Sequence, residues 1–188
     1  MLVNLTQVGL SARHRLQNAG GGFTLLELLI AVSVLTILLA IAIPSMQALL
    51  TRNHLKAAAQ ALAEDLQWTR SESIARNQML RVVFNMNHWC YGIDENASAT
   101  AHCDCRLSPG ETSACSLKQV SGAAFPGIGL TGTFSATRFE PRRATAINGS
   151  LNLTAANGPA LRVVLSRLGR VRICAPTGSV AGYEPCGG

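Results

Sequence analysis

The sequence predicts an α+β protein in which a long N-terminal transmembrane helix packs on an antiparallel β head. The run Phe23–Ile43 holds 21 residues and a single charged side chain, Glu27. A helical pattern continues to about Asn77, and short β-prone runs separated by glycine, proline and asparagine follow it. We therefore divide the chain into a leader at residues 1–22, a long helix at 23–77 with its membrane anchor at 23–43, and a β-rich head with disulfide loops at 78–188.

The first residues are typical of a targeting leader. They hold Arg13, His14 and Arg15, contain no acidic residue and end in three glycines. These small residues precede the apolar run, whereas an ordinary secretory signal is cut after it, so the anchor Phe23–Ile43 is expected to survive cleavage. A helix of this length reaches about 30 Å, which matches a bilayer core. The basic leader predicts a single-pass membrane protein with a cytoplasmic N-terminus and an exported head.

The helical pattern extends well beyond the apolar run. Pro44 removes one backbone donor and crowds the preceding turn, so we expect a kink or a local loosening there, after which the helix resumes. Between Ser45 and about Asn77, residues recur at spacings of three, four and seven. They form one stripe that is expected to face a core: Leu55, Leu62, Leu66, Thr69 and Ser73.

Six short runs beyond the helix favour β-strands, since β-branched and apolar residues alternate between turn-forming residues. They are Leu80–Met86, Trp89–Ile93, Ile128–Phe134, Leu151–Ala155, Leu161–Ser166 and Arg170–Ala175. The stretch Asn96–Ser121 is rich in alanine, serine and cysteine. We expect it to be a crosslinked loop region.

Charge is distributed unevenly along the chain. The formal net charge is +6, and from Arg138 onward seven arginines face only Glu140 and Glu184. A basic balance of this kind indicates nonspecific partners such as nucleic acid or anionic lipid, and it carries no information about the fold.

The junction between leader and anchor carries a recognisable motif. Gly22-Phe23-Thr24-Leu25-Leu26-Glu27, followed by a long apolar run and Pro44, resembles the signature of type IV pilins and pseudopilins. The resemblance implies that prepilin peptidase cleaves between Gly22 and Phe23 and that the new amine of Phe23 is N-methylated. It also implies that Glu27 pairs with that amine on a neighbouring subunit during assembly. An ionisable side chain in a membrane helix is costly and is usually functional, although a glutamate near the interface can also reach water.

Further segments resemble the GspH/FimT branch, which includes FimT-like minor pilins and pseudopilin H of type II secretion. They are Leu62–Leu66, Arg70–Arg76, Phe139–Pro141 and Gly169–Arg172. One departure concerns the turn after Pro141, where this sequence has Arg142 and Arg143 in place of an expected glycine, so we expect that turn to differ in shape.

All six cysteines follow the apolar run and would be exported, where disulfides are the default. Cys103-Asp-Cys105, with Cys90, Cys115 and His102 nearby, could also form a zinc site. Structural zinc sites usually contain paired C-x2-4-C segments, which are absent here, so disulfides are favoured. Six cysteines allow 15 pairings, and the sequence does not select one. We expect Cys174 to pair with Cys186, and the other four to pair among themselves.

No enzyme, cofactor or metal site is predicted. The stretch Gly127–Gly132 matches G-x-G-x-x-G, but a strand continues after it where a dinucleotide site needs a helix. The histidines at 54, 88 and 102 lie in unlike contexts without a triad pattern.

Two functions therefore compete. One is a FimT-like minor pilin of a type IV pilus; the other is pseudopilin H of a type II secretion system, which takes part in protein export. In both, the partners would be other pilins or pseudopilins, prepilin peptidase with its methyltransferase activity, and the inner membrane.

The arginines near the C-terminus suggest a further partner, double-stranded DNA. If Arg170–Ala175 is a strand, Arg170 and Arg172 point to the same side while Val171 and Ile173 face the core. Their spacing of about 6.6 Å suits successive phosphates. We expect Gly169 to complete the turn and Arg162 and Arg167 to enlarge the patch. Gly-Arg-x-Arg in FimT-like pilins is associated with DNA binding, and this part of the prediction is a resemblance.

Overall fold

The computed structural model describes residues 22, 24–95, 103–156, 158–176 and 180–187. Within them the chain forms one long helix, eight strands and a short 3-10 helix. The chain divides into two compact units, Met1–Ala42 and Ile43–Gly188. The predicted leader lies outside the described residues except for Gly22, and Phe23 lies outside them too.

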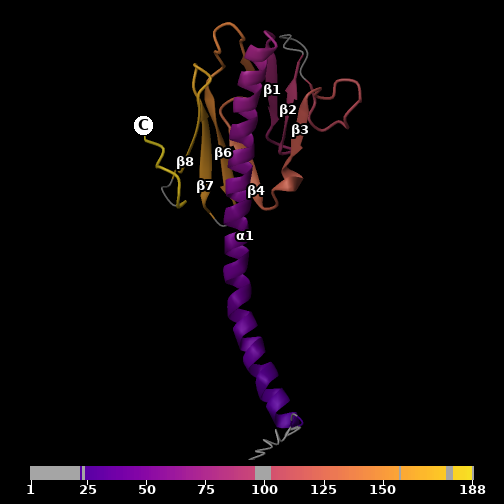
Figure 1. Cartoon of the computed structure of the whole chain (residues 1–188), viewed down its shortest axis with the longest axis vertical. Helices are drawn as coiled ribbons and strands as arrows, with labels where there is room; N and C mark the ends of the chain where they lie inside the picture. The colour runs from indigo at the N-terminus through magenta and orange to yellow at the C-terminus, as the bar shows by residue number, and fades with distance from the viewer. Residues whose placement is uncertain (1–21, 23, 96–102, 157, 177–179, 188) are drawn as a thin grey trace, which may run out of the picture. The chain divides into compact units, whose positions relative to one another are not determined.

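Helix α1 spans Leu25–Ala75 (Figure 1) and begins with a side-chain cap. The Thr24 Oγ1 accepts a hydrogen bond of 3.2 Å from the backbone N–H of Glu27. The Thr24 carbonyl accepts another, of 3.1 Å, from the N–H of Leu28. A threonine followed three residues later by glutamate is the sequence of a capping box, which explains why the helix begins here.

The other end of α1 is closed by a Schellman motif. The N–H of Gln78 donates to the carbonyl of Ser73 at 3.1 Å, and that of Asn77 donates to Ile74 at 3.2 Å. Asn77 adopts a φ of 49°, the left-handed conformation that asparagine tolerates better than most residues. Between its ends α1 is continuous and runs through position 44, as the predicted resumption of the helix requires.

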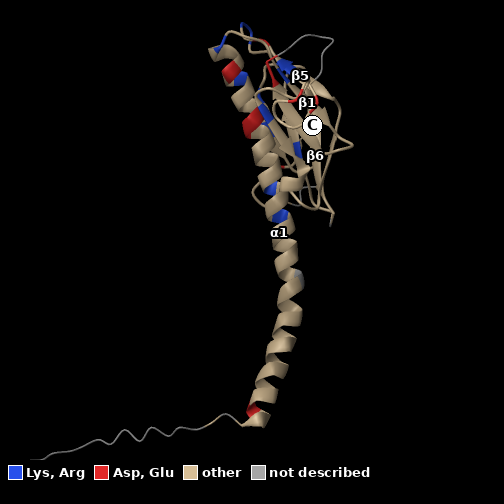
Figure 2. Cartoon of the chain, turned by 90° about the vertical axis from the view of Figure 1, so that its right-hand side faces the viewer, with Lys and Arg blue, Asp and Glu red and all other residues tan. Residues whose placement is uncertain are grey.

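The first unit contains the apolar part of α1. Its large side chains are exposed, from Leu25 at 83% to Leu39 at 48%. No charged residue occurs in α1 between Glu27 and Arg52 (Figure 2). Among the described residues, α1 is the one helix long and apolar enough to cross a membrane. An apolar surface of this extent requires burial in lipid or against other protein chains.

The second unit holds two four-stranded antiparallel sheets (Figure 1). The first sheet has the order β3-β2-β1-β5, with β1 at Leu80–Asn85, β2 at Cys90–Asp94, β3 at Lys118–Ser121 and β5 at Ala136–Phe139. The second has the order β4-β6-β7-β8, with β4 at Ile128–Gly132, β6 at Gly149–Ala155, β7 at Ala160–Leu165 and β8 at Val171–Cys174. The 3-10 helix η1, Gly122–Ala124, joins β3 to β4. The predicted α+β class, a long helix on an antiparallel head, is confirmed.

Each of the six predicted runs overlaps a strand, but two strands were missed. β3 lies inside the stretch that was expected to be loop only, and half of its residues are exposed. β5 has four residues and pairs with β1 along its length. Both are short edge elements with few apolar residues, so their pairing partners rather than their own sequences make them strands.

The predicted helical stripe is confirmed as the centre of the core. Leu55, Leu62 and Leu66 are at most 1% exposed, and Thr69 and Ser73 are fully buried. Both buried hydroxyl groups donate hydrogen bonds to backbone carbonyls of α1. Thr69 donates to the carbonyl of Asp65 at 2.6 Å, and Ser73 donates to the carbonyl of Arg70 at 2.8 Å. Both sheets contribute one face to the same core, with Val82, Phe84, Tyr91 and Ile93 from the first sheet and Leu151, Leu153, Leu161 and Val163 from the second.

The cysteine-rich insert between β2 and β3 covers the opposite face of the first sheet. Cys90, Cys103, Cys105 and Cys115 form a separate buried cluster against Val83. The structure joins Cys90 to Cys105 and Cys103 to Cys115. Gly92, which pairs with Val83, leaves room for this cluster, because a Cβ at position 92 would lie 2.2 Å from the Sγ of Cys115.

The third disulfide, Cys174 to Cys186, joins the C-terminal tail to β8. The N–H of Ala175 donates to the carbonyl of Glu184 at 2.8 Å, so the tail also pairs with the chain just after β8. The tail is therefore held at the end of β8 by a disulfide and by backbone hydrogen bonds.

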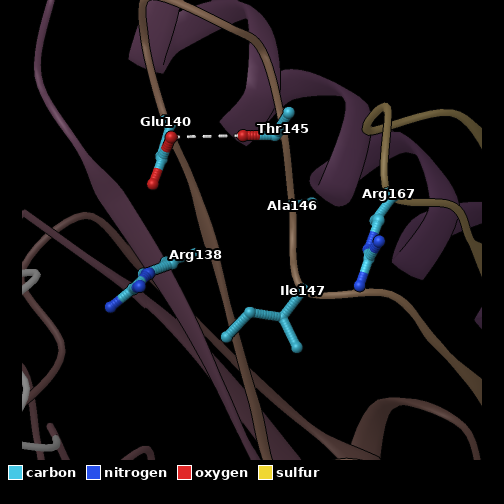
Figure 3. Close-up of a pocket in the computed structure, with 6 residues that line it drawn as sticks. All are labelled: Arg138, Glu140, Thr145, Ala146, Ile147 and Arg167. Atoms are coloured by element: carbon cyan, nitrogen blue, oxygen red, sulfur yellow. Dashed lines mark hydrogen bonds between the residues drawn. The ribbon is translucent and has the colours of Figure 1, made fainter.

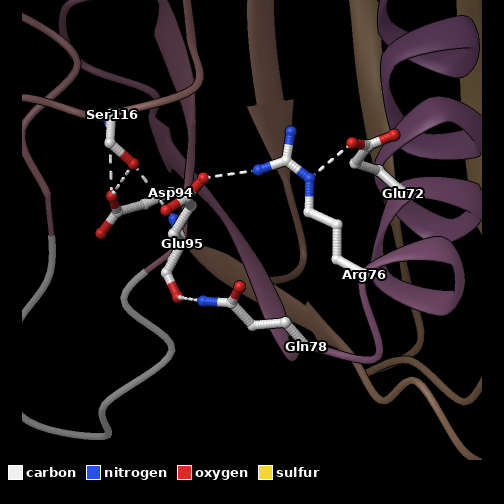
Figure 4. A network of polar contacts seen from close by, with 6 residues as sticks. All are labelled: Glu72, Arg76, Gln78, Asp94, Glu95 and Ser116. Atoms are coloured by element: carbon white, nitrogen blue, oxygen red, sulfur yellow. Dashed lines mark hydrogen bonds and ion pairs between the residues drawn. The ribbon is translucent and has the colours of Figure 1, made fainter.

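A polar network ties the end of α1 to the start of the insert (Figure 4). Arg76 bridges Glu72 at 2.5 Å and Glu95 at 2.6 Å, both through ion pairs. Ser116 donates its hydroxyl to Asp94 at 2.6 Å and accepts the N–H of Glu95 at 3.2 Å. These contacts fix the point at which the insert leaves β2.

Candidate functional site

Two regions of the chain are candidates for function: the N-terminal motif and the arginines of the head. In the motif, Glu27 lies in the first turn of α1, is exposed, and donates its backbone N–H to Thr24. The cap holds the glutamate at a defined position relative to the helix start. Gly22, immediately before the predicted cleavage point, is described and exposed, and Phe23 lies outside the described residues.

The arginines of the head carry positive charge that the fold does not neutralise. Arg76, Arg106 and Lys118 form ion pairs with acidic side chains of the described residues. None of the seven arginines from Arg138 onward forms an ion pair with a described carboxylate. Each is therefore available to an external anion. Six arginines, including Arg70 of α1, are arranged as pairs around three surface hollows.

The first hollow lies beside β5 and the turn after β7 (Figure 3). Arg138 and Arg167 line it, together with Glu140, Thr145, Ala146 and Ile147. The Thr145 hydroxyl donates to Glu140 at 3.3 Å, and Ile147 is 47% exposed between the two arginines. The N–H of Ala146 donates to the carbonyl of Arg167 at 2.9 Å and holds the two turns together.

The second hollow lies on the outer face of the second sheet. Arg162 of β7 and Arg172 of β8 line it, with Val164 between them as the register partner of Arg172. The Nε of Arg162 donates to Asn152 on β6 at 2.7 Å, which orients this guanidinium group across the strands. Because the alternating residues Leu161 and Val163 are buried, the two arginines lie on the face away from the core.

The third hollow lies between α1 and the β7–β8 turn. Arg70 and Arg170 line it, with Gln67, Ser71 and Ile74 from α1 and Gly169 and Val171 from the hairpin. Gly169 has a φ of 69° and closes the turn by donating its N–H to Ser166 at 2.9 Å. A Cβ on Gly169 would meet the Nε of Arg70 at 2.8 Å and the carbonyl of Ala144 at 2.7 Å, so only glycine fits.

The comparisons with known proteins agree with the architecture. The family described as type II transport protein GspH matches residues 58–169, more than half of the chain. The chain belongs to the GspH family. The prokaryotic N-terminal methylation motif matches residues 18–43. No curated protein sequence matched the chain.

Two solved structures are similar to this GspH-family chain. The type IV minor pilin FimU of Pseudomonas aeruginosa is 18% identical, with a TM-score of 0.49 over 66% of this chain and 94% of that chain. The minor pseudopilin EpsH from the type 2 secretion system of Vibrio cholerae is 15% identical, with a TM-score of 0.49 over 65% of this chain and 98% of that chain. The family match and the motif match make this a GspH-family chain with an N-terminal methylation motif.

The predicted arrangement of arginines in this GspH-family chain needs a correction. β8 begins at Val171, so Arg170 lies in the turn before the strand that carries Arg172. The two arginines line different hollows, and Arg167 lines a third. The tight turn closed by Gly169 rotates Arg170 toward α1. Val171 and Ile173 do pack against the core, as their alternation predicted.

Sequence reasoning also missed Arg70 and Arg138, which complete two of the pairs. Arg70 lies on the helix next to the buried Thr69, and Arg138 alternates with the buried Thr137 and Phe139 in a strand that was not predicted. The Gly127–Gly132 stretch enters β4, which pairs with β6, so it is a strand and no dinucleotide loop. In the described part of the chain, no three histidine, cysteine or acidic residues are placed to hold a metal ion.

Proposed function

We propose that this chain is a structural subunit of a type IV pilus, a FimT-like minor pilin, anchored by the apolar half of α1. The observation that carries the proposal is the methylation motif at residues 18–43, which coincides with a capped helix whose large apolar side chains are exposed. In this proposal the leader is cut between Gly22 and Phe23, the new amine is methylated, and the head lies in the periplasm. The protein performs no catalysis; prepilin peptidase acts on it.

Assembly is the step that Glu27 serves in this proposal. A glutamate carboxylate in the first turn can pair with the positive amine of a neighbouring subunit, and the low dielectric of the membrane strengthens that attraction. Glu27→Ala should be processed normally but should enter filaments poorly, as measured by immunoblotting of sheared filaments. Glu64→Ala is the matched control, because Glu64 is an exposed glutamate further along α1. Incorporation of Glu27→Ala at the level of the control would refute this role.

The second candidate is pseudopilin H of a type II secretion system, and the description of the matched family, type II transport protein GspH, is the reason to consider it. The two candidates predict different phenotypes for a deletion of the gene. Loss of piliation with normal protein export identifies the minor pilin, whereas loss of export with normal piliation identifies the pseudopilin. Neighbouring pilus genes or a secretion operon give the same distinction.

We also propose that the head binds duplex DNA through the hollow lined by Arg162 and Arg172. Guanidinium groups bind phosphate in a bidentate manner, and these two lie on one sheet face without an ion pair. Contacts of this kind are independent of sequence and sensitive to salt.

The DNA proposal is tested with the full chain in detergent by fluorescence anisotropy. The double variant Arg162→Gln, Arg172→Gln should bind more weakly, and its slope of log K against log salt should fall by about 1.8. The control Arg142→Gln, Arg143→Gln removes the same charge from a turn that lines none of the three hollows. Equal weakening in both variants would show that only net charge matters.

A further inference from the structure

The hollow between α1 and the β7–β8 turn contains a charged group with an incomplete set of partners. The Nε of Arg70 is buried and has no hydrogen-bond acceptor among the described residues. Buried polar groups are almost always hydrogen-bonded, and a buried charge without a partner is costlier still. The guanidinium group of Arg70 has therefore lost water on its inner edge without gaining an anion. An anion at its outer edge would offset that loss.

A second cation is held at the same hollow. Arg170 lines it from the opposite side, and its backbone N–H donates to the Ser166 hydroxyl at 3.1 Å. The Ser166 N–H donates to the carbonyl of Arg170 at 2.9 Å, so the backbone of the turn is fixed on both sides. Two guanidinium groups on rigid elements provide donors that need little reorganisation to bind one anion.

The lining of the hollow indicates what kind of anion fits. Gln67, Arg70, Ser71 and Ile74 lie at spacings of three and four, on one face of α1. Ile74 is 48% exposed, and Val171 is a half-buried apolar residue on the other wall. The hollow has a volume of about 300 Å³, which accommodates a carboxylate on a short methylene stem. The arginines would bind the carboxylate while the two apolar residues contact the stem.

We propose that this hollow is a receptor for the side-chain carboxylate of an aspartate or glutamate on an adjacent pilin-type subunit. This inference rests on the proposed function, because it places a second subunit against α1. All of the chain's own acidic side chains lie in the described part, and none forms an ion pair with Arg70 or Arg170. Since no acidic side chain of the chain itself occupies the hollow, we assign the carboxylate to a second molecule.

The site itself is tested without a filament. The full chain, labelled with ¹⁵N-arginine and held in detergent micelles, is titrated with sodium propionate and, separately, with inorganic phosphate at constant ionic strength. Propionate should shift the Nε–Hε signals of Arg70 and Arg170 to saturation and leave Arg142 unchanged. Absence of a saturable shift would overturn the site. A stronger response to phosphate than to propionate would overturn the carboxylate assignment.

The partner is tested in cells. Arg170→Gln and Arg70→Gln should each lower the amount of subunit in sheared filaments several-fold relative to Arg142→Gln, and Arg170→Lys should restore part of it. Arg170 is exposed, so its variant folds even if the Arg70 variant does not. If wild-type protein enters filaments and Arg170→Gln enters equally well, the receptor role is wrong. If wild-type protein enters no filament, the proposed function as a filament subunit is wrong. The receptor role is then wrong as well, even if the hollow binds propionate.

Discussion

The hydroxyl of Tyr91 donates a hydrogen bond of 2.8 Å to the Oδ2 of Asp65, and this pair joins β2 to the buried face of α1. Lys118 of β3 contacts the other oxygen of Asp65 at 2.6 Å. Tyr91 is 1% exposed and Asp65 is 7% exposed, so the carboxylate depends on these two donors. The helix, the central strand and an edge strand are thereby fixed to one another through a single side chain.

Removing this hydrogen bond should destabilise the head and change its response to alkali. Tyr91→Phe leaves Asp65 one donor short and should lower the free energy of unfolding by about 1.5–3 kcal/mol. Burial, and then the charge of Asp65, raise the pKa of Tyr91 in the fold. Above about pH 10 an unfolded tyrosine loses its proton while the folded one keeps it, so wild-type stability falls as pH rises. Denaturation by urea, followed by circular dichroism, should show a shallower alkaline decline for Tyr91→Phe. Parallel declines would contradict the role of Tyr91.

The stability of the cysteine-rich insert should depend on Gly92, which lies beneath the disulfide of Cys103 and Cys115. Gly92→Ala places a Cβ 2.2 Å from the Sγ of Cys115, and overpacking of this kind costs about 1–3 kcal/mol. Gly129→Ala is the matched control in another strand, where the nearest atom lies at 3.7 Å. Thermal denaturation should separate the two variants clearly. Equal melting temperatures would mean that Cys115 does not pack closely against position 92.

The turn after Pro141 stores backbone strain in a residue that is not glycine. Ala144 adopts a φ of 49°. Ala144→Gly should therefore stabilise the head by up to about 1 kcal/mol, since relief of the left-handed conformation outweighs the added freedom of the unfolded chain. Ala136→Gly, in the extended strand β5, should destabilise it by about 0.5–1 kcal/mol. Destabilisation by both changes would show that position 144 is not strained in solution.

The tail should detach from β8 when its disulfide is removed. The double variant Cys174→Ser, Cys186→Ser releases a link across 12 residues and should cost about 2–4 kcal/mol. Hydrogen exchange should quicken first at Ala175 and Cys186, whose N–H groups pair within the tail. Unchanged protection at these two positions would show that the hydrogen bonds alone hold the tail.

Much of the fold follows from periodicity. The stripe from Leu55 to Ser73 predicted the buried face of α1, because one apolar face per helical turn is a strong and regular signal. β3 and β5 were missed because each has four residues and is defined by its neighbours. The capping motif at Thr24 could be read directly, since a side chain and a backbone group three residues apart determine it.

The arginine sites were less predictable. Alternation along a strand placed Val171 and Ile173 correctly, but it could not locate the turn that separates Arg170 from Arg172. Gly169 was the available signal, because a glycine in a short connection between two strands often marks a left-handed turn position. Arg70 and Arg170 line one hollow although they are 100 positions apart in the sequence, and no local pattern predicts that arrangement.

Processing as a pilin-type subunit can be measured from the intact mass of the protein extracted from membranes. We expect a chain that begins at Phe23 and carries one added methyl group on its amine. Gly22→Val should retain the leader, and Gly21→Ala should not. A wild-type chain that begins at Met1 or Leu2, or at any residue beyond Ile43, would show that the protein is not processed as a pilin.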